Sequence, residues 1–203
     1  MKTFTCWSLV IAVLFISAAE AGQTINGCQL KRKTNCAGVN LSGENLTRSN
    51  LAGADLAGAD LSGADLSGDR ITEANLTKAN LSNANLSGAD LAETYMNRAN
   101  LSRANLAKAN LSQSTMPGVN LRDANLAGAN LSLVNLKGAD LTGANATGAV
   151  FTLASLVDAN LTRVDLTKAI MTGADLRNAI LQDAKYCNTT MPDRSINNSG
   201  CPR

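Results

Sequence analysis

A five-residue repeat runs through most of this 203-residue chain and constrains its fold more than any other feature. With Leu41 as the reference, every fifth position up to Leu181 is Leu in 23 of 29 units. The position two residues earlier is Ala in 20 units, and the position just before the Leu is Asn or Asp in 22. Residues 51–68, LAGADLAGADLSGADLSG, show the motif in its plainest form. No insertion shifts the phase, so the sequence predicts one local structure repeated along the chain.

The period of five excludes a continuous helix or strand as the repeating unit. On an α-helix five residues advance by about 500°, so successive Leu side chains would lie ~140° apart and form no apolar face. On a strand, side chains alternate, so an odd step sends successive Leu residues to opposite faces. The chain must instead turn once in every unit, with each Leu pointing inward. Gly at the end of many units, as at Gly53 and Gly58, suits a turn that needs positive φ.

Departures from the motif recur at a spacing of twenty residues. Residues 94–96 read Thr-Tyr-Met and residues 114–116 read Ser-Thr-Met, while the apolar pair at 150–151 is followed by another at 170–171. If units that are neighbours in space vary together, four units complete one turn of the chain.

The repeat resembles that of the pentapeptide-repeat protein family over about residues 36–191. The resemblance implies an all-β fold, a right-handed quadrilateral β-helix with four units per coil and about seven coils in a single domain. At ~4.8 Å per stacked layer, the rod is roughly 35 Å long. We expect small caps at residues 22–35 and 192–203, because the end coils of a solenoid otherwise expose core and strand edges.

Residues 1–21 have the features of a cleaved signal peptide. Lys2 precedes an apolar run at residues 7–16, and Ala19-Glu20-Ala21 fits the small-x-small cleavage pattern. The run is shorter than the roughly 20 apolar residues that span a bilayer. An N-terminal anchor or a buried strand is the alternative. We expect a mature chain that starts at Gly22 and is located in the periplasm or outside the cell.

Four cysteines follow the predicted leader, two near each end of the repeat region. An even number of cysteines in an exported chain argues for disulfides. The two ends of the implied rod are too far apart for cross-pairing, since a disulfide needs Cα atoms within about 7 Å. We therefore predict the pairs Cys28–Cys36 and Cys187–Cys201, with Cys36 in an inward position because it is in phase with Leu41. The alternatives are a buried free thiol at Cys36 or a metal site, although the chain lacks C-x-x-C and His.

No motif in the chain indicates catalysis or cofactor binding. The chain has no His, which removes the commonest general base and the commonest metal ligand. Asp55, Asp60 and Asp65 fall on successive faces of the predicted coil and diverge, so they predict a solvated surface. The basic run Lys31-Arg32-Lys33 is interpreted as a solvated patch, with contact to anionic lipid or polysaccharide as the alternative. We expect no enzyme activity, no cofactor and no metal.

Two acidic residues occupy the small inward position that Ala usually fills. Glu44 and Asp69 cannot be buried there without a large desolvation cost. They predict local distortion of the backbone in the first two coils. Of the two positions, Asp69-Arg70 is the favoured place for a bulge.

A cluster of apolar residues on the predicted surface is the candidate interaction patch. In the four-unit register, Leu133, Val150, Leu153 and Ile170 decorate one face, and Tyr95 lies on the neighbouring face. Contiguous exposed apolar area often marks a contact site. Local corner packing or tolerated drift of the repeat is the alternative, since single exposed apolar residues are normal.

These features favour an exported, non-catalytic structural or protein-binding scaffold that contacts a protein partner or itself through the apolar face. We expect no nucleic-acid partner, no membrane span and no small-molecule ligand. The resemblance also brings in family members that mimic DNA and bind DNA gyrase, but a net charge of +2 and the predicted leader oppose that function. A third hypothesis is a ligand- or surface-binding solenoid. The Thr residues that cluster late in the repeat region would be the candidates for such a surface, but they lie on several faces of the predicted coil and form no single array: Thr142, Thr147, Thr152, Thr162, Thr167 and Thr172.

Overall fold

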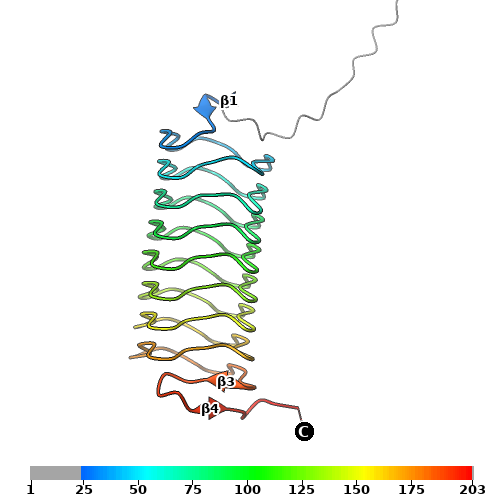
Figure 1. Ribbon diagram of the computed structural model, residues 1–203, viewed down its shortest axis with the longest axis vertical. Helices are drawn as coiled ribbons and strands as arrows, with labels where there is room; N and C mark the ends of the chain where they lie inside the picture. Colours follow the sequence, from blue (N-terminus) through cyan, green and yellow to red (C-terminus); the bar gives the residue numbers. More distant parts are fainter. Residues whose placement is uncertain (1–23, 203) are drawn as a thin grey trace, which may run out of the picture.

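The computed structural model describes residues 24–202, which form a stack of coils closed by a short hairpin at each end (Figure 1). Strands β1 (Thr24–Ile25) and β2 (Cys28–Gln29) pair antiparallel at the N-terminal end. Strands β3 (Thr189–Thr190) and β4 (Ile196–Asn197) pair antiparallel at the C-terminal end. Between the hairpins, no helix is present among the described residues, and successive coils are joined by parallel bridges.

Every parallel bridge joins two residues that are twenty apart in the sequence. The bridges run without a break from the pair Asn35–Asp55 to the pair Ile170–Thr190. One turn of the chain therefore takes up twenty residues, or four five-residue units. This pairing explains why departures from the motif recur at that spacing, because Tyr95 bridges Thr115 in the next coil.

Each unit turns the chain at its end through a tight backbone turn. In the unit that contains Leu51, the N–H of Ala54 donates to the carbonyl of Leu51 at 2.9 Å. The third residue of this turn, Gly53, has a φ of 67°, as a type II turn requires. Non-glycine residues adopt the same conformation in other units, for example Arg98 with a φ of 55°. A residue with a Cβ pays about 1–2 kcal/mol for this left-handed geometry.

The core is a column of the repeated Leu side chains with Ala beside them. Every inward position from Leu41 to Met171 is at most 1% exposed. Burial of each Leu contributes ~1.5–3 kcal/mol before the loss of chain entropy. Phe151 and Ala146 occupy inward positions of one coil and are both fully buried. The large ring of Phe151 therefore lies in the same layer as Ala146, whose side chain is smaller than the Leu that most units have at this position.

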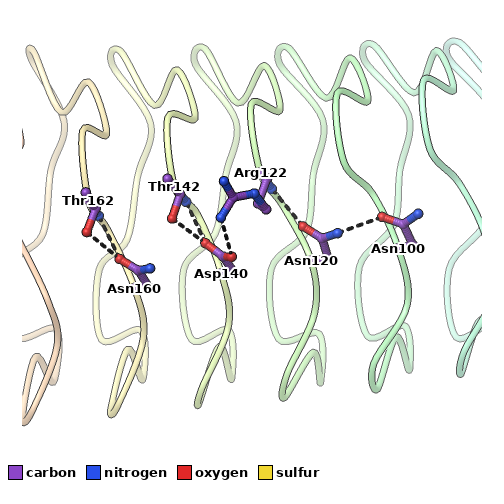
Figure 2. A network of polar contacts seen from close by, with 7 residues as sticks. All are labelled: Asn100, Asn120, Arg122, Asp140, Thr142, Asn160 and Thr162. Atoms are coloured by element: carbon purple, nitrogen blue, oxygen red, sulfur yellow. Dashed lines mark hydrogen bonds and ion pairs between the residues drawn. The ribbon is translucent and has the colours of Figure 1, made fainter.

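Asparagine side chains link the coils on the outside of the stack. The Nδ2 of Asn80 donates to Oδ1 of Asp60 at 3.0 Å, Asn100 donates to Asn80 at 3.2 Å, and Asn120 donates to Asn100 at 3.0 Å. An ionised Asp only accepts hydrogen bonds, so it starts such a ladder and cannot relay it. Figure 2 shows that the ladder ends at Asn120, because Asp140 in the next coil has no amide to donate and accepts instead from Arg122 at 3.0 Å.

The bulge predicted at Asp69-Arg70 is wrong. Arg70 keeps bridges to the residues twenty positions away in both directions, so the register is continuous. Asp69 is only 1% exposed, and the hydroxyl of Ser49 in the preceding coil donates to its Oδ2 at 3.0 Å. The other carboxylate oxygen, Oδ1, is buried and has no hydrogen-bond donor among the described residues. The small side chain of Ser49 thus accommodates the carboxylate, while Glu44 is only half-buried.

The N-terminal cap is tied to the first coil by paired cysteines. The Sγ atoms of Cys28 and Cys36 lie 2.00 Å apart, with Cα atoms 5.2 Å apart, and both residues are buried. Leu30 follows β2, is 1% exposed and packs against the end of the core. Coil pairing already begins at Lys33, whose N–H donates to the carbonyl of Ala52.

In the C-terminal cap, strand β4 pairs with the edge strand of the last coil, β3. Strand β3 bridges the preceding coil on one side and pairs with β4 on the other. The Sγ atoms of Cys187 and Cys201 lie 2.10 Å apart and join the last coil to the segment after β4. The cap therefore protects a strand edge that would otherwise be open to pairing with another chain.

The predicted leader at residues 1–21 lies outside the described residues. Within residues 24–202, the structure contains no helix with the length and hydropathy needed to cross a membrane.

Candidate functional site

The apolar strip is a row of surface side chains in the C-terminal half of the stack, defined by Leu133, Val150, Leu153 and Ile170. Val150 bridges Ile170 in the next coil, at the position that Asn or Asp fills in most units. Leu133 is 54% exposed, Leu153 is 58% exposed and Ile170 is 41% exposed. Val150 is half-buried. The structure thus brings these four predicted residues onto one side of three successive coils.

Two members of the apolar strip occupy an unfavourable backbone conformation. Leu133 has a φ of 60° and Leu153 a φ of 57°, in the turn position where Gly is frequent. Bulky side chains rarely adopt this region. The two leucines therefore carry both a conformational cost and the cost of exposing apolar area to water. Polar or charged residues such as Arg98 and Lys168 adopt the same conformation in other units, so the exposed Leu side chains are what distinguish the apolar strip.

Sequence reasoning missed one residue that lengthens the apolar strip. Thr190 bridges Ile170, and in β4 the partner of Thr190 is Ile196, which is 56% exposed. Ile196 lies outside the repeat, so no periodicity pointed to it. A second missed residue, Ile180, is 52% exposed but bridges Asn160 in a different column of the stack.

Tyr95 lies apart from the apolar strip. It is 53% exposed and bridges Asn75 and Thr115. The column continues from Thr115 to Asn135, and Asn135 is the residue two positions after Leu133. Tyr95 is therefore two coils away from Leu133, with polar residues between them, and the structure does not join it to the other candidate residues.

The apolar strip begins where an asparagine ladder ends. Asn130 donates to Asn110 at 3.2 Å, but Val150 in the following coil has no amide with which to continue the ladder. The substitution of Val at this position thus exchanges an inter-coil hydrogen bond for exposed apolar surface.

Among residues 24–202, one titratable group has a strongly shifted pKa, and it lies away from the apolar strip. Burial raises the pKa of Asp69 from 3.8 to about 7, although the hydrogen bond from Ser49 acts in the opposite direction. Among residues 24–202, no three His, Cys, Asp or Glu side chains are grouped so that they could hold a metal ion.

Comparison with known families identifies the repeat. Pentapeptide repeats match residues 32–68, 74–113, 118–152 and 147–183, in 8 copies. The chain belongs to the pentapeptide-repeat family. The matched ranges cover most of the coil region that the structure describes, and the five-residue phase continues between them.

Solved structures of pentapeptide-repeat proteins are similar to this chain. HetL, which is involved in heterocyst differentiation regulation in the cyanobacterium Nostoc sp. strain PCC 7120, is 27% identical over 82% of this chain and 90% of its own, with a TM-score of 0.47. QnrB1, a plasmid-mediated fluoroquinolone resistance protein, is 20% identical over 74% of this chain and 90% of its own, with a TM-score of 0.48. A protein from the Arabidopsis thaliana thylakoid lumen is 34% identical over 55% of this chain and 68% of its own, with a TM-score of 0.18. No curated protein sequence matches significantly.

Proposed function

We propose that this pentapeptide-repeat protein is an exported, non-catalytic scaffold that binds a protein partner or a second copy of itself through the apolar strip. Export and a periplasmic or extracellular location rest on the signal-peptide features of residues 1–21. The scaffold function rests on a long, regular rod whose interior is filled by Leu and Ala side chains. The right-handed quadrilateral shape with about seven coils is part of the same proposal, and the twenty-residue bridge spacing supports it.

The observation that carries the proposal is the conformation and exposure of Leu133 and Leu153. Gly is the residue that this turn position favours, and Gly fills it elsewhere in the same column, at Gly53 and Gly173. A Leu in this position is only partly buried in the free protein, because more than half of each residue is exposed. A contact that covers both leucines would offset these two costs.

A gyrase-binding function is the second candidate, and it is the less favoured one. QnrB1 is described as a fluoroquinolone resistance protein, but its similarity to this chain is too low to transfer a function. A protein that imitates DNA needs a strongly negative surface. The present chain has 18 Lys and Arg residues against 16 Asp and Glu residues, which disfavours that function.

Affinity capture with matched variants tests the contact surface. The mature protein and a Leu133→Gly/Leu153→Gly variant serve as baits against an extract of the source cells, and sedimentation of each bait alone reports self-association. We expect the variant to lose the partner or the self-association that the unchanged protein shows. Arg163→Gly is the matched control, because Arg163 has a φ of 59° in the same turn position on another column. If the Leu and Arg variants behave alike in both assays, the apolar strip is not the contact surface.

N-terminal sequencing of the native protein tests export independently. A chain that begins near Gly22 in the periplasmic or culture fraction supports the proposal. A chain in the cytosol with an intact Met1 contradicts it and favours an intracellular function.

A further inference from the structure

A hollow of about 560 Å³ lies on a different side of the rod from the apolar strip, and a gap in the turn side chains creates it. The residues at the turn position of five successive coils are Lys78, Arg98, Gly118, Gly138 and Asp158. The two glycines lack side chains; the Cγ atom of Arg98 lies 3.6 Å from the position of a Cβ on Gly118, and nothing lies within 4 Å of the same position on Gly138. The side chains of Arg98 and Asp158 therefore stand at the two ends of the hollow.

Positive charges outnumber negative charges in the lining of the hollow. Lys78, Arg98 and Lys137 contribute to its wall, and none of the three makes an ion pair with a carboxylate in residues 24–202. Asp158 is the single carboxylate in the lining, and it accepts a hydrogen bond from Asn178 at 3.0 Å. From Lys78 to Lys137 the chain advances three coils, so the cations are distributed over ~15 Å at ~4.8 Å per layer. This array of uncompensated cations fits a ligand with several separated negative charges.

The main chain around the hollow offers no free hydrogen-bonding edge. The N–H of Arg98 donates to the carbonyl of Pro117, that of Gly118 to Lys137, and that of Gly138 to Val157. A peptide that binds by adding a strand needs an unpaired edge, and the bridges between coils occupy both edges here. A ligand must therefore be recognised by the side chains.

The neighbouring side chains suit sugar rings. Asn97 and Pro117 line the hollow. Tyr95 is 53% exposed and lies outside the lining, two residues before Asn97. Tyr95 presents a large apolar ring with a polar hydroxyl. The Oδ1 of Asn97 is buried and has no hydrogen-bond donor among the described residues, so the amide has to rotate before this oxygen can accept from a ligand hydroxyl. Single-stranded nucleic acids need a series of stacking aromatics, whereas Tyr95 is the only strongly exposed aromatic side chain in residues 24–202.

We propose that this hollow binds an acidic oligosaccharide of the uronate class, which has carboxylates along the chain and hydroxyls on each ring. Arg98 pairs with a carboxylate through two parallel N–H donors, and Lys78 and Lys137 pair with carboxylates on neighbouring rings. Asp158 repels a further carboxylate and sets the end of the site. The proposal does not depend on the apolar strip, which lies in another column of the stack.

Calorimetric titration of the mature protein with a short oligogalacturonate tests the proposal. We expect binding that weakens as salt is added. Replacement of Arg98 by Gly removes charge-assisted hydrogen bonds worth ~1.5–3 kcal/mol, which corresponds to a loss of about tenfold or more in affinity. We expect the variant to fold normally, since Gly fills the same turn position in the next two coils. Asp158→Asn keeps an acceptor for Asn178 and is expected to strengthen binding.

Two controls make the result specific. Arg163→Gly removes an arginine from the same type of turn, with a φ of 59°, in another column, and we expect it to leave the affinity unchanged. The methyl-esterified oligosaccharide has no carboxylates and is expected not to bind. The proposal is overturned by an absence of binding at millimolar ligand, by equal losses in the two Arg variants, by equal binding of the ester, or by tighter binding of a single-stranded oligonucleotide.

Discussion

The side chain of Leu153 lies over the turn of Gly173 in the next coil. A Cβ atom placed on Gly173 would stand 2.8 Å from Cδ2 of Leu153, a distance that real Cβ contacts do not show. The side chain of Leu153 therefore occupies the space that a Cβ on Gly173 would need. This pairing, twenty residues apart, defines the shape of the apolar strip near its C-terminal end.

Replacement of the strained leucines by Gly tests whether they are retained for stability. We expect Leu133→Gly and Leu153→Gly each to change the free energy of unfolding by no more than about 1 kcal/mol, with either sign. Relief of the left-handed conformation gains about 1–2 kcal/mol, and loss of partial packing and greater freedom of the unfolded chain act against it. Urea denaturation measures the change. The buried Leu161→Ala is the contrast, with an expected loss of about 2–5 kcal/mol.

Val150→Asn is expected to extend the asparagine ladder. The new amide can donate to Oδ1 of Asn130, as Asn130 donates to Asn110, and such a hydrogen bond contributes about 0.5–1.5 kcal/mol. Val150→Asp has nearly the same shape but only accepts hydrogen bonds when ionised. We expect the Asn variant to be more stable than the Asp variant by about 1 kcal/mol or more at neutral pH. Equal midpoints of urea unfolding would show that the ladder contributes nothing at this position.

The raised pKa of Asp69 predicts that the free energy of unfolding falls as the pH rises from about 4 to about 7. Burial raises the pKa of Asp69 in the folded protein to about 7, against 3.8 for the ordinary carboxyl. The folded state therefore binds a proton more tightly than the unfolded state. Its contribution is complete below about pH 4 and is lost as the pH rises through the folded value, with a slope of at most about 1.4 kcal/mol per pH unit.

The Asp69→Asn variant provides the control for this pH dependence. It retains the shape and the acceptor for Ser49 but has no charge to titrate. We expect its free energy of unfolding to be nearly constant over the same pH range. The contribution of Asp60 to stability depends on pH in the opposite direction, because hydrogen bonds from Ser62 lower its pKa in the folded protein. That contribution is lost only as the pH falls below the ordinary carboxyl pKa of 3.8. A pH slope that is the same in both proteins would rule out Asp69 as its source.

The paired cysteines predict a mature protein without reactive thiols. Denaturation without reductant should expose no thiol, and reduction should expose four, from Cys28, Cys36, Cys187 and Cys201. Removal of either pair by Ser substitution is expected to cost about 2–4 kcal/mol, measured by urea unfolding. Cys6 lies in the predicted leader, so one reactive thiol before reduction would indicate an uncleaved chain. Four thiols before reduction would show that the pairs do not form.

The sequence predicted the inward Leu column and the turn in each unit because both follow from the five-residue period alone. Relationships between coils were harder to predict, since they join residues twenty positions apart. Ser49 makes space for Asp69, and Gly118 with Gly138 opens the hollow beside Arg98, but none of these pairs is close in the sequence. If the sequence is written in rows of twenty residues, the members of each pair fall in the same column. Ile196 follows no period, so only the pairing of β4 with β3 places it beside the apolar strip.

A photoreactive amino acid introduced at position 153 tests the central claim most directly. The same residue introduced at position 163 occupies an equivalent turn half a coil away, in another column, and serves as the control. We predict that irradiation in the native compartment crosslinks position 153 to one defined protein, either a partner or a second copy of this chain, and that position 163 gives no such product. Identical products from both positions, or no product from position 153, would contradict the proposal that the apolar strip is a contact surface.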